Sequence, residues 1–280
     1  MVIFKNADQI AAYLSNERRD NHSIGFVPTM GALHKGHLSL VQTAKTENDL
    51  TVCSIFINPV QFNNVEDFKR YPVMIEKDIE LLIESGCDIL FFPSFDQIYP
   101  EDYQKKIFDL GKLETIFEGQ YRPGHFQGVC QVMDRLLQII QPDRIYMGQK
   151  DYQQCLVIQK LLELTGKKDK YELIVEPTVR ETDGLAMSSR NLRLSDEARL
   201  KAPALYNALN YIKNNLGQQP LKTLKRNAKD SLEKEGFTVD YIDIADANTL
   251  ETFNGQSNQV VALVAATIND IRLIDNTILN

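Results

Sequence analysis

The chain has 280 residues, of which 43% are hydrophobic and 25% are charged, and its formal net charge is −7. This composition is typical of a globular protein with a sizeable core, and the negative charge argues against nucleic acid as a partner, because binding a phosphate backbone needs a basic surface. The four cysteines are scattered without a CxxC pair, which indicates reduced thiols in a cytoplasmic protein. Neither a signal peptide nor a membrane partner is expected, because no segment has the required apolar run.

Short apolar runs alternate with amphipathic stretches through the first two-thirds of the chain. Helices are expected at residues 7–18, with Asn6 as N-cap and Gln9 placed as in a capping box, and at residues 75–85, which Gly86 ends. Such alternation is typical of βαβ units and predicts an α/β fold with a Rossmann-like, doubly wound parallel sheet. The strands are expected at residues 2–4, 24–27, 51–57, 89–92, 144–147 and 172–175.

The pattern changes after Pro177, where a polar loop precedes a helix beginning near Ser195 and a lysine-rich helix ending at Gly236. Two apolar runs, residues 239–245 and 259–268, then favour strands. We therefore expect two domains. They are a Rossmann-like nucleotide-binding domain over residues 1–178 and a smaller α+β lid domain over residues 179–280.

A first candidate site follows the expected strand at residues 24–27. The sequence PTMGALHKGH places Gly31 in a tight turn and His34 and His37 in the first turn of a helix. A helix start favours phosphate through its N–H groups and dipole, and two imidazoles can add donors. The motif HxGH also resembles the HIGH signature of the adenylate-forming nucleotidyltransferase superfamily. Taken alone, two histidines at this spacing are more often surface residues or a metal-binding pair.

A second signal lies far downstream, in Met187-Ser188-Ser189-Arg190. This loop resembles the KMSKS element that partners HIGH in the same superfamily. Serine hydroxyls can donate to triphosphate oxygens, and a guanidinium can neutralise their charge in a fork geometry. A Ser-Ser-Arg-Asn loop alone is more often a turn followed by a helix cap. Both loops together, in this order, are more specific for a nucleotide site than either alone.

Polar residues also follow the expected strand at residues 144–147, at the edge where open α/β sheets bind ligands. Gly148 is followed there by Lys150, Asp151 and Gln154. The lysine would contact phosphate, the aspartate a ribose hydroxyl and the glutamine a polar substrate. On local sequence alone, the better interpretation is a charged turn in which Asp151 caps the next helix.

Two neutral amides, Asn58 and Gln61, follow the expected strand at residues 51–57 and would project at the same edge. Such groups suit a substrate whose hydroxyls are recognised while its carboxylate stays reactive, because a fixed cation would stabilise the ground-state carboxylate. Asn58 and Pro59 also form a turn signal, and both interpretations can hold together.

The whole chain resembles the pantothenate synthetase family, because PTMGALHKGH, FINPVQF, YRPGHF, PDRIYMGQKDYQQ and TVRETDGLAMSSRN occur in its order and spacing. The resemblance implies a homodimer and an ATP- and Mg²⁺-dependent ligase that condenses pantoate with β-alanine through a pantoyl adenylate, releasing AMP and pyrophosphate. Carried over by position, ATP binding falls to Met30, Gly31, His34, His37, Gly148, Lys150, Asp151, Val179, Met187, Ser188, Ser189 and Arg190.

The resemblance also implies roles in catalysis and substrate binding. His37 is expected to be the proton donor, with His34, Lys150 and Arg190 as further catalytic groups. Asp78 is the expected acid on the Mg²⁺ side, and Gln149 departs from the family, which commonly has glutamate there beside Lys150. Pantoate and β-alanine are expected to contact Gln61, Gln154 and Asn58.

Three other functions fit parts of the pattern. Another nucleotidylyltransferase of the HIGH superfamily would keep the nucleotide on its product, so free AMP separates it from a ligase. An aminoacyl-tRNA synthetase is disfavoured by the short, acidic chain. A zinc-binding or nucleotide-sensing regulator would use His34 and His37 as metal ligands, but no Cys/His cluster supplies the remaining ligands at tight spacing.

Overall fold

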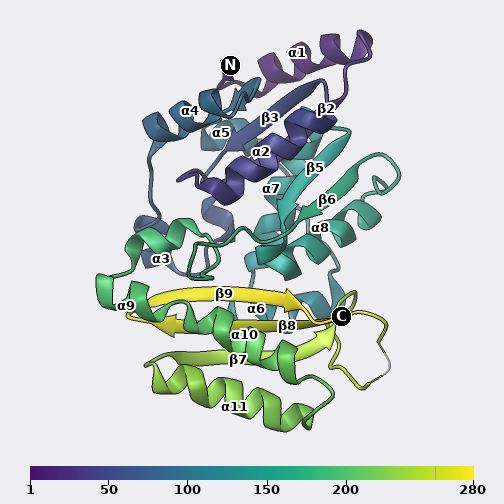
Figure 1. Ribbon diagram of the computed structural model, residues 1–280. Helices are drawn as coiled ribbons and strands as arrows, with labels where there is room; N and C mark the ends of the chain where they lie inside the picture. Colours follow the sequence, from purple (N-terminus) through teal and green to yellow (C-terminus); the bar gives the residue numbers. More distant parts are fainter. Residues whose placement is uncertain (256) are drawn as a thin grey trace. The chain divides into compact units, whose positions relative to one another are not determined.

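A computed structural model describes residues 1–255 and 257–280 of the chain, which divides into two compact units (Figure 1). The larger unit consists of Met1–Gly148 and Gln154–Pro177, and the smaller of Gln149–Gln153 and Thr178–Asn280. The short segment Gln149–Gln153 therefore belongs with the carboxy-terminal part of the chain, although it lies within the amino-terminal part of the sequence.

The larger unit contains a six-stranded, all-parallel sheet in the order β1-β4-β3-β2-β5-β6. All six expected strands are present, although β3 ends at Ile55 because the backbone turns at Asn58 and Pro59. The strands are β1 (Val2–Phe4), β2 (Ile24–Thr29), β3 (Leu50–Ile55), β4 (Ile89–Phe91), β5 (Arg144–Gly148) and β6 (Glu172–Glu176).

Helices connect these strands, and the expected start of the first helix after Asn6 and the expected end of the helix before Gly86 are both confirmed. Asn6 caps the first helix by accepting a bond from Gln9 N at 3.0 Å, and Gly86 follows the end of α4 with φ +74°. The helical elements are α1 (Ala7–Arg19), α2 (Lys35–Glu47), η1 (Pro59–Gln61), α3 (Val65–Lys69), α4 (Ile75–Glu84), α5 (Phe95–Ile98), η2 (Gly111–Glu114), α6 (Glu118–Tyr121), α7 (His125–Ile140) and α8 (Tyr152–Leu164).

The central strands β2, β3 and β4 are buried on both faces of the sheet, whereas the edge strands β1 and β6 are more exposed. Successive residues of a strand point to opposite faces, so Phe26 joins the core formed with α1, α7 and α8, whereas Val27 joins the core formed with α2 and α4. Both side chains are fully buried. Burial of both faces explains why these strands read as continuous apolar runs, and it confirms the doubly wound α/β fold.

The strand order reverses between β2 and β5. From β2 the chain moves outward to β3 and β4, and it later returns to the other side of β2 as β5, with Gly25 opposite Arg144. Ligands of open α/β sheets bind at the carboxyl ends of strands beside such a switch point. Thr29 and Gly148, the last residues of β2 and β5, lie at this point.

The smaller unit is an α+β domain whose antiparallel sheet has the order β7-β8-β9. Buried residues of α10 and α11, including Leu209 and Leu224, pack in one core with Val264 of β8. Its elements are η3 (Gln149–Asp151), η4 (Ser189–Arg193), α9 (Asp196–Lys201), α10 (Ala204–Asn215), α11 (Leu221–Lys234), β7 (Thr238–Asp246), β8 (Val260–Ile268) and β9 (Ile271–Ile278).

Strand β9 is absent from the sequence prediction. Its residues Asp275 and Asn276 are polar yet buried, so the alternation of apolar and polar residues does not reveal the strand. The turn before it gives a better signal, because Asn269 and Asp270 have φ of 46° and 63°, as a two-residue type I′ hairpin requires. A two-residue Asn-Asp turn between apolar residues would have predicted the hairpin.

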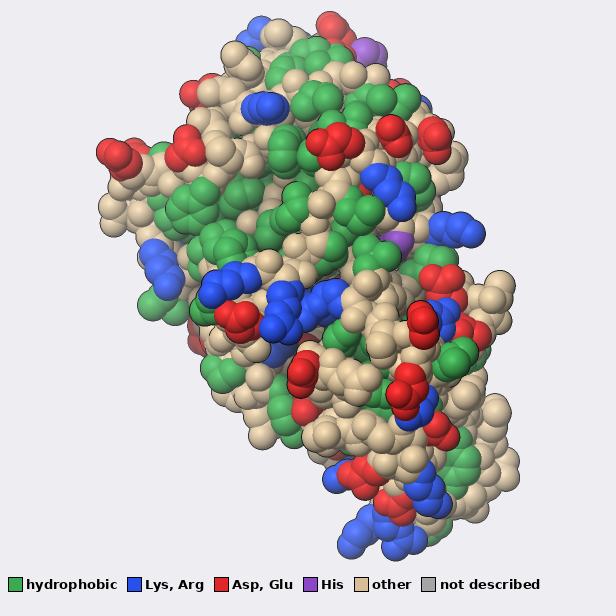
Figure 2. Space-filling model, turned by 90° about the vertical axis from the view of Figure 1, so that its left-hand side faces the viewer, with side chains coloured by type: hydrophobic (Ala, Val, Ile, Leu, Met, Phe, Trp, Pro, Cys, Tyr) green, Lys and Arg blue, Asp and Glu red, His purple; other side chains and the backbone are tan. Residues whose placement is uncertain are grey.

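The surface carries charges of both signs. Figure 2 shows both acidic and basic side chains on the face in view, with several basic side chains gathered near its middle. Among the described residues, no helix is both long and apolar enough to cross a bilayer.

Candidate functional site

The loop after β2 has a tightly constrained backbone. Gly31 has φ +81°, and a Cβ at this position would lie 3.0 Å from Asp78 Oδ2. Ala32 also has a positive φ, of 48°, which is unfavourable for a residue with a side chain. The buried Asp78 carboxylate of α4 holds this conformation, because Ala32 N donates to Oδ2 at 2.8 Å and Leu33 N donates to Oδ1 at 2.7 Å.

These bonds assign Asp78 to loop positioning. Asp78 is only 2% exposed. Burial raises the pKa of its carboxyl group, whereas the hydrogen bonds from the N–H groups of Leu33 and Ala32 lower that pKa. The expected role of Asp78 beside Mg²⁺ stays a prediction. In the described part of the chain, no group of three His, Cys, Asp or Glu side chains could hold a metal ion.

The two histidines lie at the start of α2, with their rings stacked and their centroids 4.0 Å apart. Gly36 N donates to His34 Nδ1 at 3.2 Å, and His34 N donates to His37 Nδ1 at 3.4 Å. Because each Nδ1 accepts a bond, the proton of each neutral ring is on Nε2. The helix start therefore combines its dipole with two Nε2–H donors, an arrangement that suits an anion.

Gln61 and Asn58 form one hydrogen-bonded unit. Asn58 Nδ2 donates to Gln61 Oε1 at 3.3 Å, and Gln61 Nε2 lies 3.2 Å from the Met30 sulfur. Asn58 is only 1% exposed, and Tyr99 OH donates to its Oδ1 at 3.2 Å. Asn58 also caps η1 by accepting from Val60 N, so its interpretation as a turn residue is confirmed.

His125 supports Gln61 from α7, a role that the sequence interpretation missed. Its Nδ1 lies 2.8 Å from Gln61 O and donates to that carbonyl. Gly128 allows the close approach of α7, because a Cβ there would lie 2.6 Å from Gln61 Cα. A sequence signal for this residue was nevertheless present, because His125 is the histidine of the segment YRPGHF.

In the smaller unit, the loop with the two serines has an ordered base. Met187 N donates to Val179 O at 3.0 Å, and Arg190 N donates to Ser188 Oγ at 3.3 Å. Ser188 therefore caps η4, as the interpretation of a turn and cap predicts. Ser189 is 6% exposed, whereas Ser188 and Arg190 are half-buried.

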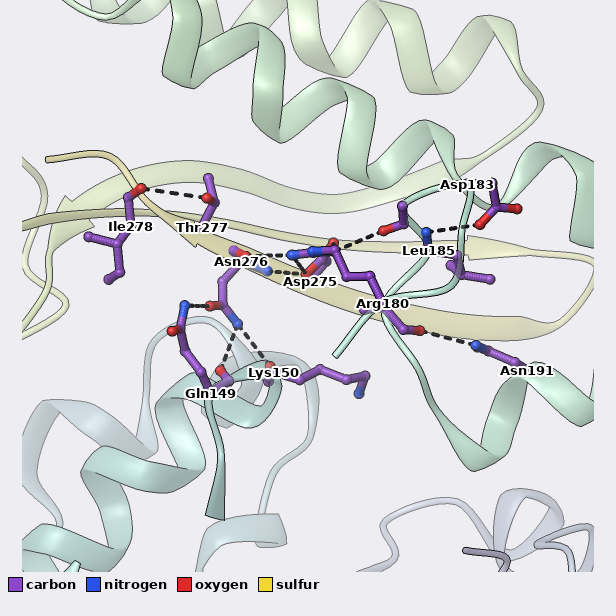
Figure 3. A network of polar contacts seen from close by, with 12 residues as sticks. Gln149, Lys150, Arg180, Asp183, Leu185, Asn191, Asp275, Asn276, Thr277 and Ile278 are labelled. Carbon is purple, nitrogen blue, oxygen red and sulfur yellow. Dashed lines mark hydrogen bonds and ion pairs between the residues drawn. The ribbon is translucent and has the colours of Figure 1, made fainter. Parts of the chain in front are cut away.

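Lys150 and Asp151 lie in η3 of the same unit. Lys150 Nζ is 3.5 Å from Asp151 Oδ1, and the side chains are 16% and 49% exposed, respectively. The backbone around Lys150 is bound to Asn276 of β9 (Figure 3).

The structure thus arranges the expected site residues in two sets. Gly148 and Gln154 lie in the larger unit, at the end of β5 and in α8. The larger unit also brings Met30, Gly31, His34, His37, Asn58, Gln61 and Asp78 to the end of its sheet, and the smaller unit contains Lys150, Asp151, Val179, Met187, Ser188, Ser189 and Arg190.

Comparisons with known proteins agree in one family. The family model described as pantoate-beta-alanine ligase matches residues 2–278. A pantothenate synthetase of Cytophaga hutchinsonii is 43% identical over 284 residues, covering 100% of this chain and 99% of the relative.

Two solved structures are similar as well. A pantothenate synthetase from Thermus thermophilus has a TM-score of 0.92 at 42% identity, with 99% of each chain covered. A pantoate-beta-alanine ligase from Francisella tularensis, in complex with beta-gamma ATP and beta-alanine, has a TM-score of 0.84 at 36% identity, covering 100% of this chain and 98% of that one. Since family model, relatives and structures agree over the full length, this chain belongs to the pantoate–β-alanine ligase family.

Proposed function

We propose that this chain condenses pantoate with β-alanine by way of a pantoyl adenylate, using ATP and releasing AMP and pyrophosphate. Membership of the family supports the overall reaction. The observation that carries the nucleotide assignment is the start of α2, where the Nδ1 bonds of His34 and His37 leave both protons on Nε2. Two such donors and a helix dipole favour the phosphates of a nucleotide.

The first step would turn an unreactive carboxylate oxygen into part of a leaving group. The pantoate carboxylate attacks the α-phosphorus of ATP and pyrophosphate departs, so negative charge grows on the departing phosphates. His34, His37, Lys150 and Arg190 are proposed to stabilise that charge. Mg²⁺, as part of the MgATP substrate, would neutralise phosphate charge further. The remaining nucleotide contacts are proposed for Met30, Gly31, Gly148, Asp151, Val179, Met187, Ser188 and Ser189.

Pantoate itself is proposed to bind to neutral amides. Gln61 and Gln154 would recognise its hydroxyls without pairing with the carboxylate that must react. Asn58 is buried, and its amide bonds to Gln61, so we propose that it orients Gln61 rather than contacting the substrate.

In the second step the free amine of β-alanine would attack the adenylate, which needs no covalent enzyme intermediate. The described thiols are in keeping with this route, because all four cysteines are buried. Burial raises the pKa of Cys87 to about 11 and that of Cys130 to about 12, so these thiols stay protonated at neutral pH.

Exchange of labelled pyrophosphate into ATP tests the adenylate. We expect exchange that depends on pantoate and proceeds without β-alanine, followed by release of free AMP when β-alanine is added. Exchange that ignores pantoate would contradict the adenylate route. A product that retains the nucleotide would instead identify the chain as a nucleotidylyltransferase.

Substitution of Gln61 tests the acid pocket. Gln61→Ala should raise the KM for pantoate with little change in the KM for ATP, because the lost amide contacts the acid. The exposed Gln104→Ala serves as the matched control. A change confined to the KM for ATP would contradict the proposed contact between Gln61 and pantoate.

The family resemblance further supports a cytoplasmic homodimer, in which the smaller unit acts as a lid that protects the adenylate from water. Light scattering on the purified protein tests the assembly. A homodimer has twice the chain mass of 32.0 kDa.

A further inference from the structure

Two consecutive residues of β9 each bind one of the loops of the smaller unit that carry phosphate contacts in the proposed function (Figure 3). We propose that Asn276 and Asp275 are positioning residues of the nucleotide site. Asn276 would fix the backbone that presents Lys150, and Asp275 would fix, through Arg180, the base of the loop that leads to Arg190. This inference rests on the proposed phosphate contacts of Lys150 and Arg190.

Asn276 binds the first loop with its entire side-chain amide. Its Nδ2 donates to Gln149 O and to Lys150 O, both at 2.9 Å, and its Oδ1 accepts from Gln149 Nε2 at 3.1 Å. Both amide hydrogens are therefore used on two consecutive carbonyls. Rotation of the amide by 180° would set its oxygen against those carbonyls, so the three bonds fix a single orientation. At 2% exposure, Asn276 is also shielded from competing water.

Lys150 depends on this anchor through its own backbone. The residue whose carbonyl Asn276 holds is the one that bears the ammonium group, and the lysine side chain is only 16% exposed. A shift of the η3 backbone would move the ammonium with it. Because stabilisation of a transition state falls steeply with misplacement, a small shift is enough to lower the rate.

Asp275 holds the second loop through a bidentate ion pair. Its Oδ2 lies 2.6 Å from Arg180 Nη1 and its Oδ1 lies 3.0 Å from Nη2. The same guanidinium donates to Asn276 O and to Gly184 O and lies 4.4 Å from the centroid of the Tyr206 ring. Two parallel bonds in a fork give directional restraint as well as energy.

Arg180 transmits that restraint to the loop. Its backbone forms a bridge with Ala186, and the next residue, Met187, donates its N–H to Val179 O at 3.0 Å. Asp275 and Asn276 are themselves held in the sheet, because Asp275 pairs with Val264 and Asn276 pairs with Leu263 of β8. One segment of sheet thus carries both loops, which would otherwise be independent.

Kinetics of Asn276 variants test the inference. We expect Asn276→Ala to lower kcat/KM for ATP by about 10- to 100-fold, the scale of a misplaced catalytic group, while the KM for pantoate stays near wild type. Asn276→Asp keeps the shape but sets a carboxylate against two carbonyls, so its loss should be at least as large. The matched control is Asn227→Ala, which removes an amide bond to Tyr211 OH elsewhere in the unit and should be near wild type.

A double-mutant cycle separates positioning from a general structural effect. If Asn276 acts through Lys150, Asn276→Ala should cost little more in a Lys150→Ala background. Fully additive losses, or wild-type kinetics in a folded Asn276→Ala protein, would overturn the inference. Near-wild-type kinetics in Lys150→Ala alone would instead refute the proposed phosphate contact.

Gln149→Leu keeps the test open if Asn276→Ala does not fold. The variant removes the Nε2 donor of Gln149, so Asn276 Oδ1 loses one of the three bonds that fix the orientation of the amide. A smaller loss in kcat/KM for ATP is expected, with an unchanged melting temperature. Wild-type kinetics in this variant as well would overturn the role of Asn276.

Discussion

Two buried carboxylates, Asp78 in the larger unit and Asp275 in the smaller, each hold a loop of the candidate site by different means. Asp78 accepts bonds from two neutral backbone N–H groups of the loop itself, whereas Asp275 binds the Arg180 guanidinium. Burial raises the pKa of both carboxyls, opposed by backbone N–H groups at Asp78 and chiefly by Arg180 at Asp275. Removal of Asp78 therefore takes an acceptor from two neutral N–H groups, whereas removal of Asp275 takes the anion from a charged guanidinium.

The largest expected effect on stability follows from Asp275→Ala. We expect it to lower the free energy of unfolding by about 3–5 kcal/mol, because it leaves the largely buried Arg180 without its anion. Urea unfolding measures the loss. The control in the same unit is Glu233→Ala, which breaks an exposed ion pair with Lys229 on α11 and should cost about 1 kcal/mol or less. Equal losses in the two variants would remove the distinction between the buried and exposed pairs.

Removing one phosphate donor from each unit should lower turnover to a similar extent. His37→Ala in the larger unit and Lys150→Ala in the smaller should each cost about 2.7–4 kcal/mol of transition-state stabilisation, the scale for one donor in a dry site. Initial rates of AMP formation give the value. Lys168→Ala, whose side chain is 59% exposed, is the control. Near-wild-type turnover in either variant would refute the role assigned to that unit.

A smaller loss of stability is expected for Asp78→Ala. The variant leaves the N–H groups of Ala32 and Leu33 without their acceptor, at a cost of about 1–3 kcal/mol for a buried neutral donor. The KM for ATP should rise as well, because His34 follows the loosened loop. If Asp78→Ala lowers the free energy of unfolding as much as Asp275→Ala does, the stability cost does not depend on whether the group left behind is neutral or charged, and the comparison fails.

The smallest effect is a pH dependence at Asp78. In the folded chain this carboxyl has a pKa above its ordinary value of 3.8, so the folded state holds the proton more tightly than the unfolded state. This tighter proton binding stabilises the folded state fully below pH 3.8, and the stabilisation is lost as the pH rises through the folded pKa. Unfolding of wild type and Asp78→Asn across mildly acidic pH should show wild type losing its relative stability as the pH rises. The opposite slope would contradict the raised pKa.

Local patterns predicted most of the fold. The six parallel strands, the Asn6 cap and the end of α4 at Gly86 depend on neighbouring residues, and each was predictable from hydrophobic runs or helix-end chemistry. Strand β9 was not predictable in this way, because Asp275 and Asn276 interrupt its apolar pattern. These two polar side chains bind Arg180 and Gln149, which lie far away in the sequence. The expected helix near Ser195 is likewise two helices, α9 and α10, with Pro203 between them.

The α/β class, the helix start that bears His34 and His37, and the family resemblance could all be predicted before folding is considered, because each is encoded in contiguous residues. Three features became visible only in the folded chain: Asn58 is buried and bonded to Gln61, Asp78 holds the loop before α2, and residues 149–153 belong to the smaller unit. Those contacts join residues as far apart as Gln149 and Asn276, separated by 127 positions, and no local pattern reports a partner at that distance.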